Sequence, residues 1–436
     1  MLITPPSHSR AHRPALLLPA LLAVTALALA GCGTGAPGSG AAQASASATG
    51  GEETVEAKET PGRAPRLVLT HDEGISVLDA KTLEAVGELP LAGFNRVSPA
   101  GDGRHVLVAT GDAFRILDAG VWTEAHGDHG HSYAGEPRMR DRAFDASKAG
   151  HVVNHADQTV LFSDGSGRVD IFDPAALTDG LAAGLPSTST YITPEAHHGV
   201  AIGLQGGQLL VTLGNAEGRS GMALLGAPAA GDGQDRAELL RNEDCPGVHG
   251  EAVAGADTVV VGCEDGMLVY RAGAFTKVAS PDAYGRMGNQ AGSAASPVIL
   301  GDYKVDRDAE LERPTRVSLV NTDTGELKLV DLGVSYSFRS LGRGPAGEAL
   351  VLGTDGALHV IDPLTGAVTA KIPVVGAWEE PEVWQDPRPT LFVLGSRAYV
   401  TEPATSSIHA VDLKTGKVVK SAELAHAPNE MTGVTG

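Results

Sequence analysis

The sequence predicts an all-β protein, and composition together with turn pattern is the basis of that prediction. It contains 56 glycines in 436 residues, and short apolar runs alternate with turn residues along most of its length. The apolar fraction of 42% is enough for a sizeable core, so a wholly disordered chain is not expected. The length allows one large domain or two to three average ones.

Repeated units make this prediction more specific. In each unit, an apolar run, a turn such as Asp-Gly and an alternating run predict a hairpin, and segments such as DPLTGAVTAKI predict a further outer strand. Successive units begin 38 to 54 residues apart, about 47 on average, which is typical of β-propeller blades. We therefore expect one propeller of eight blades, with seven as the alternative. The units begin at Val68, Val106, Val160, Leu209, Val259, Val298, Ala349 and Ala398.

The end of the chain predicts how the propeller closes. Residues 425–436 resemble one inner strand without a blade of its own, whereas the first unit, near Arg66, lacks an inner strand. Pairing of these N- and C-terminal strands would close the ring and remove its free sheet edges. A disordered tail is the alternative.

The first 31 residues are expected to be a lipoprotein signal peptide. Arg10 and Arg13 precede an apolar run over residues 15–30, which is short for a membrane span but suits a secretory signal. The sequence Leu-Ala-Gly-Cys ending at Cys32 resembles the lipobox of bacterial lipoproteins. That resemblance implies cleavage before Cys32 and a lipid on its thiol, with an ordinary secretory signal as the alternative.

Residues 32–65 are rich in Gly, Ala, Ser, Thr, Pro and Glu, so we expect the lipidated Cys32 to be followed by a flexible linker. The propeller domain is expected over residues 66–436. This organisation predicts an extracytoplasmic protein, lipid-anchored to the outer face of the cell membrane.

Net charge excludes two classes of partner. The chain carries 53 acidic and 33 basic side chains, for a net charge of −20. This charge opposes a phosphate backbone, so we expect no nucleic-acid partner. It equally disfavours a basic patch on anionic lipid, which leaves the lipid on Cys32 as the only expected membrane contact.

Cys245 and Cys263 remain once Cys32 is assigned to the lipid. An even pair of cysteines in an exported protein predicts a disulfide. A pair of metal-binding thiolates is the alternative, although the spacing lacks the C-x-x-C pattern of common zinc sites.

The densest group of metal-ligand residue types is the stretch HGDHGHSY. Its candidate ligands are His126, Asp128, His129 and His131, separated by glycines that make the segment pliable. Imidazole and carboxylate suit Zn²⁺, so we expect this segment to contact zinc. A solvated loop without a metal role is the alternative.

A second set of histidines shares one position in the repeat. His151, His198 and His249 each precede the second strand of a blade by about 9 to 11 residues, which places them at the start of inner strands of a propeller. We expect them to converge near the central channel and to share a metal, with bonding to neighbouring backbone as the alternative. His426 has a similar place before the closing strand.

The other histidines of the domain lack this register, and we expect structural roles for them. His197 should point away from His198. The remaining residues of this kind are His71, His105, His155, His359 and His409.

Together, HGDHGHSY, GHVVNH, AHHGV and CPGVHGEA with GCEDG resemble the AztD-type zinc metallochaperones. The resemblance covers the chain from about residue 66 to its end. It implies an extracytoplasmic propeller that binds Zn²⁺ and transfers it to the solute-binding protein of an ABC zinc importer. It also implies capture or transfer by the 126–131 segment. The predicted lipid anchor does not fit a free periplasmic protein. The linker contains no His cluster, so any capture role belongs to the 126–131 segment.

Two other classes stay open at this point. A metal-dependent propeller enzyme, hydrolase- or lactonase-like, would need a carboxylate base beside a metal-bound water, and Glu251 is a candidate. The sequence shows no G-x-S-x-G, P-loop or G-x-G-x-x-G fingerprint, and only three Trp argue against a quinoprotein. We therefore expect no enzyme. A non-catalytic protein-interaction propeller is the other alternative.

Overall fold

The structure is a computed structural model that describes residues 57–180, 184–229, 234–255 and 257–436. The predicted signal peptide, Cys32 and most of the predicted linker lie outside these ranges. Nearly all regular structure is β. The helical elements within the described ranges are short, and none qualifies as a membrane span. They are α1 (Ala175–Gly180) and the 3₁₀ turns η1 (Gln205–Gly207) and η2 (Pro403–Thr405).

Within the described residues, eight sheets share a core of four antiparallel strands that mostly follow sequence order. The all-β propeller prediction is therefore confirmed. In the first four sheets, from inner to outer strand, the members are β36 (Met431–Val434), β2 (Arg66–His71), β3 (Gly74–Asp79) and β4 (Ala85–Pro90); β5 (Arg96–Pro99), β6 (His105–Ala109), β7 (Ala113–Asp118) and β10 (Arg138–Asp145); β11 (Ala149–His155), β12 (Gln158–Ser163), β13 (Arg168–Phe172) and β14 (Ser189–Ile192); β15 (Ala201–Gly203), β16 (Leu209–Gly214), β17 (Arg219–Leu225) and β18 (Glu238–Asn242).

The other four sheets repeat this pattern, and the fifth adds the short strand β23 (Gly285–Arg286) beside β21. Their members are β19 (His249–Ala254), β20 (Thr258–Cys263), β21 (Asp265–Arg271) and β22 (Ala274–Ala279); β24 (Gln290–Ser293), β25 (Ser296–Asp302), β26 (Arg316–Asn321) and β27 (Leu327–Asp331); β28 (Leu341–Arg343), β29 (Ala349–Leu352), β30 (Ala357–Ile361) and β31 (Val368–Pro373); β32 (Leu391–Leu394), β33 (Arg397–Glu402), β34 (Ser407–Asp412) and β35 (Lys417–Glu423).

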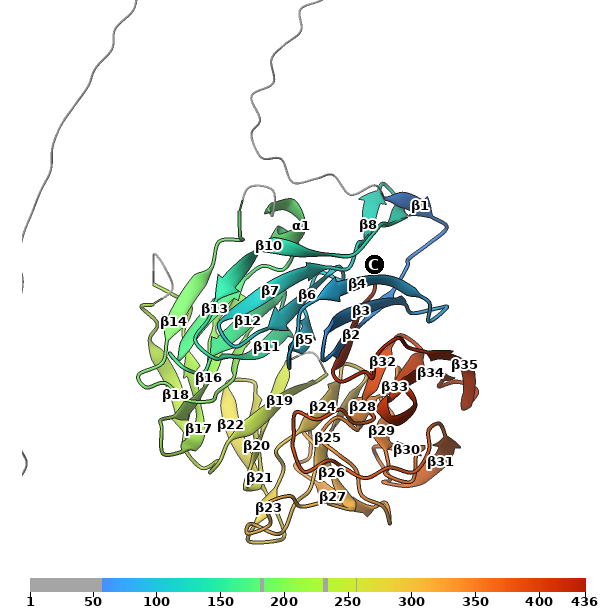
Figure 1. Ribbon diagram of the computed structural model, residues 1–436. Coiled ribbons are helices and arrows are strands. Elements are labelled where there is room, and N and C mark those ends of the chain that lie inside the picture. Colours follow the sequence, from blue (N-terminus) through green and yellow to red (C-terminus); the bar gives the residue numbers. More distant parts are fainter. Residues whose placement is uncertain (1–56, 181–183, 230–233, 256) are drawn as a thin grey trace, which may run out of the picture. The chain divides into compact units, whose positions relative to one another are not determined.

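The ring closes through the C-terminal strand, as the sequence predicted. β36 pairs antiparallel with β2, and Arg66 lies opposite Val434. Figure 1 shows the red C-terminal strands meeting the blue first sheet. This pairing satisfies the backbone groups at the edge of β2 that would otherwise be exposed to another chain.

The core consists of separate apolar layers between neighbouring sheets. Val68 and Val108 belong to the layer between the first two sheets, and Leu69 and Ile408 to the layer between the last sheet and the first. In a sheet buried on both faces, strands read as near-continuous apolar runs, as in the VLVA run of β6 and the VVVGC run of β20.

A separate three-stranded sheet corrects two expectations. β8 (Val121–His126) and β9 (His129–Ala134) form a hairpin with a two-residue turn, and β1 (Lys58–Thr60) pairs with β9. The 126–131 segment is therefore a hairpin end and not the pliable loop that its glycines predicted, because Gly127, at φ 62°, sits in the tight turn. Within the predicted linker, residues 58–60 form β1, since the edge of β9 offers unpaired backbone groups to an extended segment.

The predicted disulfide is present between Cys245 and Cys263. Cys263 is the last residue of β20, and Cys245 lies shortly before β19; both are buried. The bond ties the segment that leads into His249 to the neighbouring strand.

Candidate metal centre

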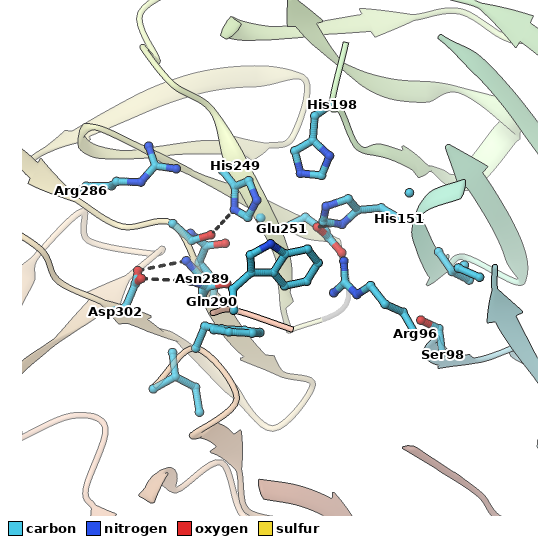
Figure 2. Close-up of a pocket in the computed structure, with 18 of the residues that line it drawn as sticks. Arg96, Ser98, His151, His198, His249, Glu251, Arg286, Asn289, Gln290 and Asp302 are labelled. Carbon is cyan, nitrogen blue, oxygen red and sulfur yellow. Dashed lines mark hydrogen bonds and ion pairs between the residues drawn. The ribbon is translucent and has the colours of Figure 1, made fainter. Parts of the chain in front are cut away.

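Three of the predicted histidines converge in the central channel. The ring centroids of His151 and His198 are 5.2 Å apart, those of His198 and His249 5.2 Å, and those of His151 and His249 5.9 Å. One ligand nitrogen from each lies within 4.8 Å of the others. Figure 2 shows the three rings turned toward one another from separate strands and loops.

Local backbone irregularities direct two of these side chains. The register of β11 against β12 shifts between Ala149 and Val152, and that of β19 against β20 shifts between His249 and Glu251. Such bulges turn a side chain away from the regular alternation of a strand. Gly250 permits the second bulge, because its φ is 70° and an added Cβ would lie 2.7 Å from the Gly288 carbonyl oxygen.

Each imidazole has its Nδ1 directed at an oxygen. His198 Nδ1 lies 2.6 Å from Asp164 Oδ2, and His249 Nδ1–H donates to the Gly288 carbonyl at 2.6 Å. His151 Nδ1 lies 3.4 Å from Glu251 Oε2. Bonds of this kind hold metal-binding histidines in one tautomer and leave Nε2 for the ion.

The three histidines line a cavity of about 600 Å³, and Glu251 and Arg286 line the same cavity. Burial lowers the pKa of His249 to about 3, an effect that the Gly288 carbonyl opposes and the neighbouring His151 and His198 reinforce. His249 is consequently neutral at physiological pH, which is the form that binds a metal. Glu251, beside His151 Nδ1, is the carboxylate that the enzyme alternative would use as a base.

The second predicted group is also assembled, with one difference. Centroids of the His126, His129 and His131 rings lie 5.0 to 5.6 Å apart, at the exposed end of the β8–β9 hairpin. Asp128 is not part of this group: it occupies the turn, is fully exposed and pairs with the neighbouring His129 Nδ1 at 3.2 Å. The carboxylate that reaches across to the group is Glu59 of β1, whose Oε1 lies 2.6 Å from His131 Nδ1.

Sequence reasoning missed Glu59 because it lies 72 residues from His131, inside a segment with linker composition. It also missed a third group, formed by His71, Glu88 and His426. No sequence spacing could have indicated it, since the residues come from opposite ends of the chain. The expectation for His197 holds: it is buried and bonds to the Glu195 carbonyl and the Thr212 hydroxyl.

No protein-family model matches the chain. The chain is 24% identical over 385 residues to the zinc chaperone AztD of Citrobacter koseri, which covers 85% of this chain and 86% of that protein. The resemblance to AztD is therefore confirmed. The crystal structure of Citrobacter koseri AztD superposes with a TM-score of 0.72 at 23% identity, covering 86% of this chain and 99% of the AztD chain. At that identity, the likeness to the AztD crystal structure establishes a shared fold.

The fold also occurs in a protein with another role. The dihydro-heme d1 dehydrogenase NirN has a TM-score of 0.54 at 11% identity, over 87% of this chain and 77% of its own. A propeller alone therefore does not separate a carrier such as AztD from an enzyme. The distinction depends on the chemistry of the site.

Proposed function

We propose that this chain is a zinc-binding metallochaperone that captures Zn²⁺ outside the cytoplasmic membrane and holds it at His151, His198 and His249. One observation carries the proposal: three imidazoles converge while Asp164, Glu251 and the Gly288 carbonyl engage their Nδ1 atoms. Three nitrogen ligands with an open or carboxylate-filled fourth position are a common zinc environment. The similarity to a protein named as a zinc chaperone supports the same cargo.

The acceptor in this proposal is the solute-binding protein of an ABC zinc importer. A carrier must release its cargo, and ligand exchange allows release without a bare ion. His198 is suited to leave first, because its side chain is 40% exposed whereas that of His151 is 15% exposed. His198 also precedes β15 instead of lying within a strand, so an acceptor ligand can replace it while His151 and His249 keep the ion.

We assign first capture to the hairpin histidines, His126, His129 and His131. Their exposure gives them direct access to dissolved zinc, and Glu59 adds negative charge beside them. Asp128 stays a proposed auxiliary ligand that would have to turn toward the group. In this scheme the lipid on Cys32 keeps the protein at the outer face of the membrane, near the importer.

The carrier proposal includes no catalysis. Glu251 beside His151, in a cavity of about 600 Å³, is the one observation that favours a metal-dependent hydrolase instead. That alternative predicts turnover of lactone or ester substrates by the zinc-loaded chain, and its loss in Glu251→Gln. A carrier predicts no turnover in either protein.

The decisive test is a zinc titration of the metal-free full chain at pH 7.5, followed by mixing with the purified binding protein. We expect zinc uptake, and transfer to the acceptor faster than release of zinc to a chelator of similar affinity. A chain that takes up no zinc at this pH would refute the metallochaperone proposal. Transfer no faster than release to the chelator would refute direct delivery while leaving zinc binding intact.

A further inference from the structure

The seam where the ring closes contains a histidine with an unusual environment. His71 is the last residue of β2 and is 6% exposed. Its Nδ1 is buried and has no hydrogen-bond partner among the described residues, and its Nε2 lies 3.4 Å from Glu88 Oε2. A buried polar atom without a partner is costly and calls for an explanation.

The C-terminal segment places a second imidazole against the first. His426 lies in the connection between β35 and β36, and its ring stacks on His71 with centroids 4.1 Å apart and planes 5° apart. Its side chain is 36% exposed, and its Nδ1 lies 3.7 Å from Glu73 Oε2. His71, Glu88 and His426 each bring a ligand atom within 4.8 Å of the others.

The segment beneath this group is firmly held. The Thr70 N–H donates to the Glu430 carbonyl, and the Asn429 N–H donates to the Thr70 carbonyl. The Ser76 hydroxyl donates to Glu88 Oε2 at 2.9 Å. His71 and Glu88 are therefore fixed by the sheet, and His426 is the member with freedom to turn.

We propose that His71, Glu88 and His426 form a further binding site for a divalent ion of the zinc class, with Glu73 available as an additional oxygen ligand. Two imidazoles and carboxylate oxygens suit Zn²⁺. An ion shared by two imidazoles lies near the plane of each, so His426 turns out of the stack when it binds. The ion binds between His71 Nε2 and Glu88 Oε2, whose separation of 3.4 Å suits two metal bonds of about 2.0–2.2 Å.

This site has a consequence that the other two histidine groups do not share. Its ligands come from β2, β4 and the segment before β36, so a bound ion ties the first sheet to the end of the chain. An ion that binds the folded state alone stabilises it, and the stabilisation grows with the logarithm of the ion concentration once that concentration exceeds the Kd. Zinc bound here strengthens the closure of the ring, independently of any cargo carried in the channel.

The test uses a full-length reporter chain in which the other two groups are removed, with His126→Gln, His129→Gln, His131→Gln, His198→Ala and His249→Ala. Zinc is titrated against a competing chelator, and thermal unfolding is followed with and without zinc. We expect one ion per chain and a rise in Tm with zinc. Adding His426→Ala or, separately, Glu88→Gln should remove both effects.

His155→Gln in the same reporter is the matched control, since His155 belongs to none of the three histidine groups, and it should keep both effects. Circular dichroism verifies that each reporter variant is folded before titration. A reporter chain that binds no zinc overturns the proposal, as does one whose binding survives both His426→Ala and Glu88→Gln. Both outcomes are separate from the proposed carrier function, which is tested on the chain with all its histidines.

Discussion

The channel histidines and the hairpin histidines are chemically alike but are held in different ways. His151 and His249 lie on bulged inner strands, and their imidazoles are fixed by partners from other parts of the propeller. His126 and His129 face each other across a two-residue turn, with solvent around them. Zinc affinity depends on how far ligands are fixed before binding, because ordering them costs free energy. The channel group should therefore bind tightly and the hairpin group rapidly but weakly.

The largest expected effect comes from removing channel ligands. His198→Ala with His249→Ala should weaken tight zinc binding by more than about 100-fold. Loss of a residue that only positions a ligand costs up to about 100-fold in affinity, and this double variant removes two ligands themselves. A chelator competition measures this affinity, and circular dichroism verifies that the fold is kept. His155→Gln serves as the control histidine variant. If the double variant keeps the affinity of the parent chain, the tight site lies elsewhere.

Second in size is the effect of a positioning residue. Asp164→Asn removes the charge that orients His198, and we expect about a 10- to 100-fold loss of zinc affinity. Asp323→Asn is the matched control, because Asp323 is exposed and pairs with Arg271 far from the channel group. Equal affinities for these two variants would show that Asp164 does not orient the ligand.

The hairpin should affect rate more than affinity. Replacing His126, His129 and His131 with Gln keeps the strands, and we expect zinc loading and delivery to slow while tight affinity changes little. Stopped-flow transfer to the importer's binding protein, beside a chelator competition on the same samples, separates the two quantities. A triple variant that loads and delivers at the parent rate would leave the hairpin as a solvated surface element.

A separate expected effect, on folding stability and not on zinc binding, is a pH dependence of the metal-free chain. Burial lowers the pKa of His249 to about 3 in the folded state, whereas an unfolded histidine titrates near about 6.5. The unfolded state therefore binds this proton more readily, so the stability is complete above pH 6.5 and falls as the pH drops toward 3. Denaturant unfolding between pH 7 and pH 4 should show a smaller loss for His249→Gln than for the parent chain. An equal loss in both proteins would argue against a shifted His249.

Much of the architecture could be predicted because it follows from the spacing of apolar and turn residues along the chain. Apolar runs and Asp-Gly turns recur at blade spacing, and a sheet buried on both faces leaves a strong signal of this kind. The shared offset of His151, His198 and His249 likewise follows from the repeat, since equivalent positions in a ring face the same axis. The Cys245–Cys263 bond was predictable from the cysteine count in a chain that is expected to be exported.

Other features depended on contacts between distant segments. The glycines around His126 predicted a pliable loop, but cross-strand pairing made a hairpin, and Glu59 replaced Asp128 as the carboxylate beside it. His71 had no functional signal in the sequence, yet ring closure brings His426 onto it.

The sequence by itself determined the blade pattern and the shared repeat position of the channel histidines, because both are encoded in residue type and repeat spacing. Only the tertiary structure decided which carboxylates face which imidazoles, because those pairs join residues that are neighbours in space and remote along the chain.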